Sequence, residues 1–186
     1  MQLSTLIKLI ITGLSFQAAT SIYDLSVIGI DGSQIPMSNF KGKKILILIV
    51  PATNATTDIA YLKTIDSLAK AYEKTYAIIA IPSYEYGYSD ITATVEKDTY
   101  ISNMSGSVFI SRAAYTKKAS GKKQDNLFGW LTNASQNTHF DQEVRGLGQK
   151  YFINETGELF AVFGPEMTLN AKLLEEMNKL QATFNQ

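Results

Sequence analysis

The residues best placed to do chemistry follow an apolar run, Ile45–Val50, that is rich in β-branched side chains. The next segment, Pro51–Asp58, predicts a short turn in which Thr56, Thr57 and Asp58 offer oxygens to the free amides of a helix. Because those amides and the helix dipole favour negative charge, such a turn can activate a nucleophile or hold a small anion. The turn has no cysteine, serine, lysine or histidine, so it predicts anion binding without a strong nucleophile.

The whole chain narrows the chemistry further, because its 186 residues include no cysteine. Disulfides, thiol catalysis, cysteine-bound zinc and iron–sulfur clusters are therefore excluded. His139 is the single histidine, which also excludes a metal site built from several histidines. We expect no metal and no cofactor, and we expect His139 to be solvated in a polar loop.

The loop Ser83–Asp90 holds a second group of candidate side chains, after the apolar run Tyr76–Ile81. Glu85 and Asp90 could act as an acid–base pair or bind a cation loosely, and the nearby tyrosines could stack on a ligand or anchor a partner. We favour the alternative that the carboxylates are solvated and the tyrosines cover the ends of a sheet. The candidate binding residues of the two loops are Thr56, Thr57, Tyr84, Glu85, Tyr86 and Tyr88.

The charge composition argues against polyanionic partners. Lys+Arg and Asp+Glu both number 17, which gives no electrostatic reason to expect nucleic acid or an anionic membrane. A lysine cluster could bind phosphate, but we favour an exposed loop for it, and it comprises Lys117, Lys118, Lys122 and Lys123. The partner that we expect is an unknown small ligand or a protein.

Residues 1–20 resemble an export signal. The segment Leu6–Phe16 is mostly apolar, includes Lys8, and precedes small residues that suit cleavage. We expect a cleaved signal peptide over 1–20 and a domain over 21–186. The alternative is an uncleaved anchor or an N-terminal helix. Cleavage predicts an exported protein, periplasmic or secreted, without stable membrane insertion.

Apolar periodicity predicts the elements that position these loops. Asp31-Gly32 joins two expected strands, Ile22–Ile30 and Gln34–Met37, in a hairpin. The expected strands that follow are Ile45–Val50, Tyr76–Ile81, Ser107–Ser111, Lys150–Ile153 and Glu158–Phe163. The expected helices are 56–74, Ile91–Met104, Asn126–Asn133, with Trp130 in the core, and Thr168–Leu180. This order predicts an α/β fold with a mixed central sheet, helices on both faces and an N-terminal β-hairpin.

Six short motifs, in order, make residues 21–180 similar to the glutathione peroxidase family. They are Ser21-Ile-Tyr-Asp-Leu25 with Ile30-Asp-Gly32, Ser38-Asn-Phe-Lys-Gly-Lys43, Ile81-Pro82, Tyr86-Gly87, Asn126-Leu-Phe-Gly-Trp-Leu131 and Lys150-Tyr-Phe-Ile-Asn-Glu-Thr-Gly157. The resemblance implies a thioredoxin-like, three-layer α/β/α sandwich. It also implies a turn that carries a peroxidatic cysteine or selenocysteine, a glutamine in the loop after the second long strand, and a Trp-Asn pair.

The chain departs from that family at each catalytic position. The resemblance puts Ala55 at the nucleophile, Glu85 at the glutamine, and Gly146 and Leu147 at the Trp-Asn pair. Ser83 stands where the family has a further cysteine. Peroxide reduction by this route needs a thiolate or selenolate that attacks the O–O bond, and a threonine hydroxyl cannot replace it. No catalytic residue is therefore assigned.

The sequence predicts a family member that has lost thiol peroxidase activity and has a non-catalytic binding or interaction role. The alternatives are an enzyme with a non-thiol site near Glu85 and Asp90, with or without His139, and a residual part in the response to oxidative stress.

Overall fold

A five-stranded sheet in the order β5-β4-β3-β6-β7 forms the centre of the protein. The computed structural model describes residues 20–52, 56–89 and 93–184. The sheet strands are β3 (Lys44–Val50), β4 (Tyr76–Pro82), β5 (Val108–Ile110), β6 (Lys150–Ile153) and β7 (Leu159–Phe163). The helices are α1 (Thr56–Ala71), α2 (Ala93–Asn103), α3 (Asn126–Leu131), α4 (Ala134–Asn137) and α5 (Ala171–Phe184). A separate antiparallel hairpin pairs β1 (Ser26–Ile28) with β2 (Gln34–Pro36).

The central strand, β3, is buried along its whole length. It pairs in parallel with β4 and antiparallel with β6, so its neighbours take up its backbone hydrogen bonds on both sides. The β-branched residues that dominate it suit a strand covered on both faces. The sheet is mixed, as the sequence predicts.

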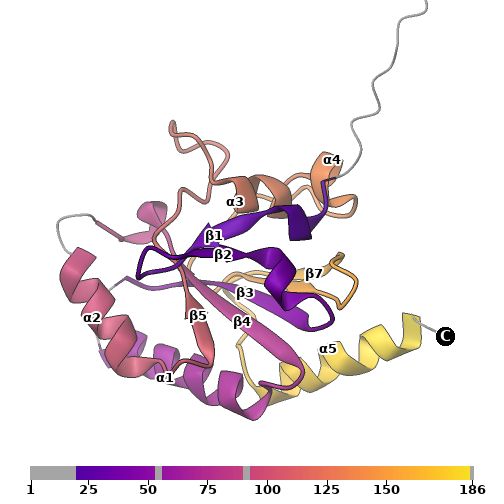
Figure 1. Ribbon diagram of the computed structural model, residues 1–186, viewed down its shortest axis with the longest axis horizontal. Coiled ribbons are helices and arrows are strands. Elements are labelled where there is room, and N and C mark those ends of the chain that lie inside the picture. Colours follow the sequence, from indigo (N-terminus) through magenta and orange to yellow (C-terminus); the bar gives the residue numbers. More distant parts are fainter. Residues whose placement is uncertain (1–19, 53–55, 90–92, 185–186) are drawn as a thin grey trace, which may run out of the picture.

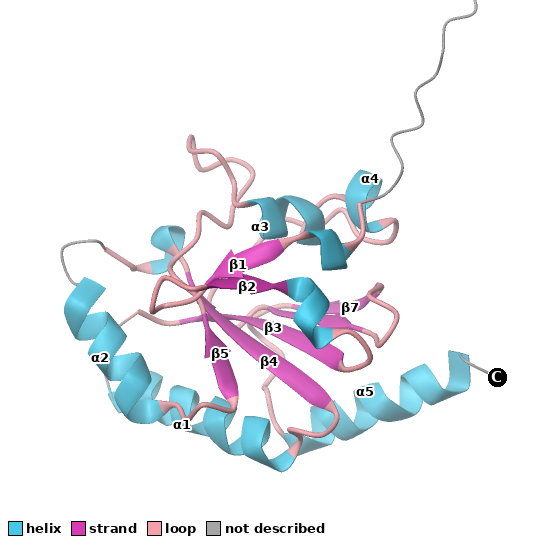
Figure 2. Cartoon of the chain, viewed as in Figure 1, coloured by secondary structure: helices cyan, strands magenta, loops and turns pink. Residues whose placement is uncertain are grey.

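Side chains of β3 alternate between two cores. Ile45, Ile47 and Ile49 face the hairpin and α3, whereas Leu46 and Leu48 face α1, α2 and α5. In Figure 1 the three helices run along one face of the sheet, and the hairpin and α3 lie over the other face. Figure 2 shows the same three layers by type of element. The predicted three-layer arrangement and the N-terminal hairpin are confirmed.

Two local predictions differ from the structure. The strand expected from Ile22 begins at Ser26, because Ile22–Asp24 forms a 3-10 turn capped by the Ser21 side chain, which accepts a hydrogen bond from the Tyr23 amide. The short helix α4 was not expected; the Asn133 side chain caps it by accepting from the Ser135 amide. Caps of this kind depend on single side chains and leave no apolar period to detect.

The prediction for Trp130 is confirmed. Its side chain lies on the buried side of α3, and its indole nitrogen donates to the carbonyl oxygen of Thr20 at 2.6 Å. The indole thus ties the first described residue to the core on the hairpin side. Burial of a tryptophan in this way suits its large apolar ring and single polar donor.

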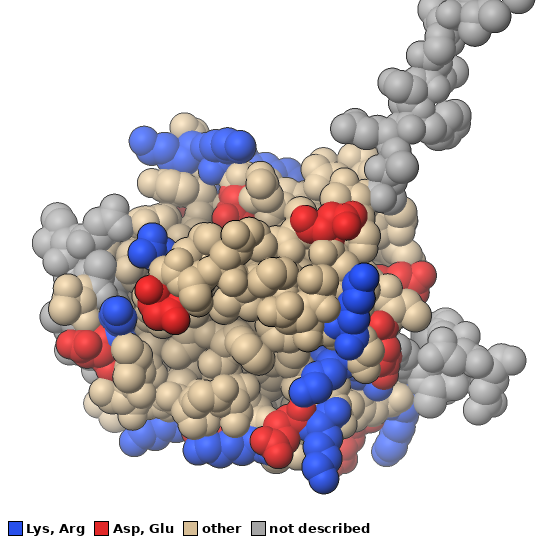
Figure 3. Space-filling view, in the orientation of Figure 1, with Lys and Arg blue, Asp and Glu red and all other residues tan. Residues whose placement is uncertain are grey.

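The surface carries charge of both signs. Figure 3 shows a broad uncharged area at the centre of one face, with basic and acidic side chains around it. None of the helices in the part of the chain that the structure describes is long and apolar enough to span a bilayer.

Asp66 joins α1 to the segment that follows α2. Its Oδ1 accepts hydrogen bonds from the amide and the hydroxyl of Ser105, both at 2.6 Å, and its Oδ2 forms an ion pair with Lys70 at 2.7 Å. Burial acts to raise the pKa of Asp66, but these hydrogen bonds and the charge of Lys70 outweigh burial and lower it.

Replacing this carboxylate should destabilise the fold. Asp66→Ala leaves the Ser105 donors without their acceptor, so we expect a loss of about 2 kcal/mol in the unfolding free energy. Lys70→Ala is the matched control, because it removes only the exposed ion pair and should cost less than about 0.5 kcal/mol. Urea unfolding measures both, and equal losses would contradict the role given to Asp66.

Candidate functional site

The loop before β6 is fixed against the carboxyl end of β3. Pairing of the two strands continues past their regular register, because the Ile49 amide donates to the Gln149 carbonyl at 3.1 Å and the Gly148 amide donates to the Ile49 carbonyl at 2.7 Å. The Gln149 side chain is fully buried, accepts from the Arg145 amide at 2.7 Å, and donates to the Tyr151 hydroxyl at 2.7 Å. Residues 145–149 therefore hold one conformation beside the start of α1.

A pocket of about 390 Å³ lies between this loop, α1 and the segment before α5. The side of α1 that carries Asp58, Tyr61 and Thr64 forms one wall. The remaining lining residues are Pro51, Leu147, Gly148, Lys150, Pro165, Met167, Thr168 and Leu169. The carboxyl ends of strands are where open α/β sheets usually bind ligands. We call this cavity the β3-end pocket.

Lys150 is a buried cation of the β3-end pocket. The residue is 1% exposed, and it pairs with Leu48, so its side chain lies on the face of the sheet covered by helices. Its Nζ donates to the carbonyl oxygen of Gly148 and, at 3.3 Å, to that of Gly164. Among the described residues no carboxylate forms an ion pair with it. Burial lowers the pKa of Lys150 to about 8, although the negative charge of Glu166 acts to raise it.

Tyr61 supplies a second polar group to the same pocket. Its hydroxyl is buried and has no hydrogen-bond partner in the part of the chain that the structure describes. Burial raises the pKa of Tyr61 to about 12. A Cβ at Gly148, whose φ is 77°, would lie 3.6 Å from the Tyr61 hydroxyl oxygen. Gly148 therefore adjoins both polar groups, since its carbonyl oxygen is an acceptor for Lys150.

Some of the residues that the sequence predicts for this region line the β3-end pocket, and others do not. Leu147, which is 36% exposed, lines the β3-end pocket, whereas Gly146 is buried against Pro165. Thr56 and Thr57 lie in the first turn of α1, are exposed, and do not line the pocket. Ala55 and Asp90 lie outside the described residues.

Glu85 is held in a network of hydrogen bonds. Its Oε2 accepts from the Ser83 hydroxyl at 2.9 Å and from the amide and hydroxyl of Thr116 at 3.0 and 3.1 Å. Burial acts to raise the pKa of Glu85, but these hydrogen bonds outweigh it and leave the pKa below its ordinary value. The carboxylate therefore joins the loop after β4 to the segment after β5, and a low pKa does not suit a general acid.

His139 lies in the turn after α4 and is exposed. Its Nδ1 lies 2.8 Å from the Thr138 hydroxyl and 3.0 Å from the Asn137 carbonyl oxygen. Neither His139 nor Glu85 lines the β3-end pocket. The non-thiol site near Glu85 and Asp90 stays a prediction, because Asp90 lies outside the described residues.

The three tyrosines of the loop after β4 pack against neighbouring groups. The Tyr84 ring stacks on Tyr115 at 4.6 Å and meets the edge of Tyr88 at 5.3 Å. Tyr86 donates to the Val144 carbonyl at 3.1 Å, and the Lys117 ammonium lies 4.8 Å from its ring centre. These contacts agree with the covering role, and a binding role for the tyrosines stays a prediction.

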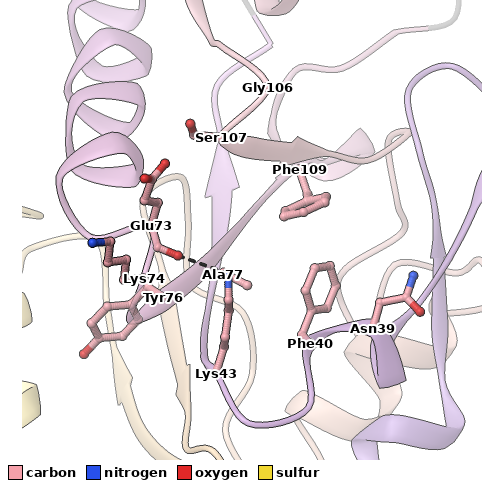
Figure 4. Close-up of a pocket in the computed structure, with 10 residues that line it drawn as sticks. All are labelled: Asn39, Phe40, Lys43, Glu73, Lys74, Tyr76, Ala77, Gly106, Ser107 and Phe109. Atoms are coloured by element: carbon pink, nitrogen blue, oxygen red, sulfur yellow. Dashed lines mark hydrogen bonds between the residues drawn. The ribbon is translucent and has the colours of Figure 1, made fainter.

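A larger pocket, of about 770 Å³, lies at the opposite end of the sheet. Figure 4 shows its lining residues, with Phe40 and Phe109 facing one another. The Lys43 side chain donates to the Glu73 carbonyl at 3.1 Å, and both residues are exposed. Unlike the β3-end pocket, it has no buried and unpartnered polar group among its described lining residues.

Comparison with known proteins defines the class first. The structure matches that of Trgpx in apo form with a TM-score of 0.63, 16% identity, and coverage of 87% of this chain and 95% of the other. It matches the exposed lipoprotein thioredoxin Etrx1 of Streptococcus pneumoniae with a TM-score of 0.56, 19% identity, and coverage of 83% and 98%. These matches, with the mixed sheet between helices, define a thioredoxin-like α/β fold.

The sequence then defines the family. The family profile described as glutathione peroxidase matches residues 22–132, and the chain belongs to that family. It is 23% identical over 149 residues to glutathione peroxidase 1 of Caenorhabditis elegans, covering 78% of this chain and 88% of that protein.

The sequence does not predict the two polar groups of the pocket, the Lys150 ammonium and the Tyr61 hydroxyl, as site residues. Lys150 was assigned to a strand, and the alternation of sides along β6 could have indicated that it shares the helix-covered face with Phe152. Tyr61 lies beside the buried stripe of α1, which comprises Leu62, Ile65, Leu68 and Ala69, so the apolar period of the helix does not indicate it.

The buried ammonium should make stability depend on pH. In the unfolded chain a lysine has a pKa of about 10.4, so between about pH 8 and pH 10 the unfolded state binds more protons and the unfolding free energy should rise with pH. The raised pKa of Tyr61 acts in the opposite sense only above about pH 10, where unfolded tyrosine ionises.

Denaturant unfolding of Lys150→Met at several pH values from 8 to 10 tests this prediction. The variant should show a smaller rise than the wild type, whereas Lys63→Met, which removes an exposed lysine of α1, should follow the wild type. Parallel curves for Lys150→Met and the wild type would contradict the depressed pKa.

Proposed function

We propose that this protein is a glutathione peroxidase family member that has lost thiol peroxidase activity and now binds a ligand in the β3-end pocket. The observation that carries the proposal is the absence of cysteine from the full chain, with Ala55 in the turn that should hold the nucleophile. A thiolate is the group that attacks peroxide and passes through a sulfenic acid, and no other side chain here repeats that cycle.

The other family positions support the loss. Leu147 stands at the position of the Trp-Asn pair and turns an apolar side chain toward the pocket. Glu85 stands at the position of the glutamine, and one oxygen of its carboxylate, Oε2, accepts hydrogen bonds from Ser83 and Thr116. Replacements at all of these positions are expected when selection for the reaction has ended but selection for the fold continues.

A binding role is supported by two buried polar groups in the pocket. It contains a buried ammonium without an ion-pair partner and a buried hydroxyl without a hydrogen-bond partner among the described residues. Groups of this kind are costly to bury, and a ligand can satisfy them. The enzyme alternative has one comparable group, because Glu85 Oε1 is also buried without a hydrogen-bond partner among the described residues, but neither Glu85 nor His139 lines this pocket.

We further propose that the protein is exported, to a periplasm or out of the cell. Residues 1–20 support this proposal by their apolar run and small-residue end. Its partner would then be a small ligand, or a protein, met outside the cytoplasm.

Peroxide turnover tests the loss of activity. Purified protein should not accelerate the consumption of hydrogen peroxide or an organic hydroperoxide when glutathione or thioredoxin is the reductant. Ala55→Cys is the matched variant, because it adds the missing thiol, and that thiol should react with peroxide. Turnover by the wild-type protein would contradict the proposal, whereas reaction of the variant alone would show that the thiol was the missing group.

A further inference from the structure

We infer that the β3-end pocket binds a small monocarboxylate, with the carboxylate against Lys150 and Tyr61 and an apolar chain against Leu147 and Met167. This inference rests on the proposed binding function and names the ligand class.

The buried ammonium of Lys150 favours an anion in the pocket. Lys150 lies among backbone carbonyls that orient its ammonium but do not neutralise it. Glu166 is near enough to influence it, yet its carboxylate is paired with Arg145 at 2.6 Å on the surface. An ammonium removed from water without a counter-ion is costly, and a bound carboxylate would supply one.

The orphan hydroxyl favours the same group. Tyr61 can donate a hydrogen bond to a carboxylate oxygen, and Gly148 adjoins both this hydroxyl and the Lys150 ammonium. Two donors of this kind match the two oxygens of one carboxylate. Asp58 also lines the pocket, but it lies in the first turn of α1, where the helix dipole stabilises its negative charge.

The rest of the lining favours an apolar chain on the ligand. Leu147 and Met167 are 36% and 41% exposed, which is high for large apolar side chains, and Leu169 continues the apolar wall inward. A flexible methionine adapts to irregular apolar ligands. A cavity of about 390 Å³ suits a carboxylic acid of a few carbons better than a bare inorganic anion.

The affinity for the carboxylate should depend on pH, because it depends on the charge of Lys150. The titratable groups around its ammonium are Glu166 from the loop after β7, whose charge acts on Lys150, and Tyr61 and Asp58 from α1, which line the same pocket. Tyr61 stays protonated through this range because burial raises its pKa. Affinity should therefore fall as pH rises above about 8, where Lys150 loses its charge.

A calorimetric titration at pH 7, in which hexanoate is added to the full-length protein, tests the inference. Lys150→Met should weaken binding by about tenfold or more, and Tyr61→Phe by about three- to tenfold, as expected for one lost charged or neutral donor. Lys63→Met should bind as the wild type does. Hexanamide, which has the same shape without the charge, should bind at least about tenfold more weakly than hexanoate.

Several results would overturn the inference. They are no hexanoate binding by folded wild-type protein, equal binding of hexanoate and hexanamide, or inorganic phosphate bound as tightly as hexanoate. If Lys150→Met does not fold, Tyr61→Phe and the fall in wild-type affinity between pH 7 and pH 9.5 decide the question. Failure of carboxylate binding would leave the proposed loss of peroxidase activity standing, because that loss is tested separately by peroxide turnover.

Discussion

The structure depends on the complete burial of the central strand, β3, between two layers of apolar side chains. A strand without access to water must pair its backbone on both sides, and β4 and β6 do this. Pairing with β6 continues through Gln149 and Gly148, so the loop before β6 lies beside α1. The β3-end pocket, including the buried ammonium of Lys150, is thus a consequence of how the central strand satisfies its hydrogen bonds.

This dependence is compatible with the proposed loss of the family's reaction, because the fold does not need the catalytic residues. The core uses the alternating apolar residues of β3 and the stripes of α1 and α5, and none of these needs a thiol. Glu85 and Leu147, which stand at two of the catalytic positions, lie outside the strands of the sheet, where a change costs little stability. Leu147 and Glu85 illustrate the two outcomes, since one lines a pocket and the other bridges two segments.

Elements with strong periodicity were predictable from the sequence. Six apolar residues in Ile45–Val50 and the apolar stripe of α1 each report burial directly, so both elements form where expected. The 3-10 turn at Ile22–Asp24 was not predictable, because a few local hydrogen bonds, including one to the Ser21 side chain, hold it. The roles of Lys150 and Tyr61 depend on which face of the sheet and which neighbours they meet, and single-sequence patterns do not record those contacts.

The β3-end pocket holds a buried ammonium, and we propose that a carboxylate ligand neutralises it. NMR of protein labelled with carbon-13 at lysine Cε follows the titration of Lys150 directly, with Lys150→Met used to assign its signal. We expect Lys150 to titrate at about pH 8 in the free protein and at a higher pH when hexanoate is bound. Titration near the ordinary lysine value of about 10.4, without a response to hexanoate, would show that the pocket does not hold such a group.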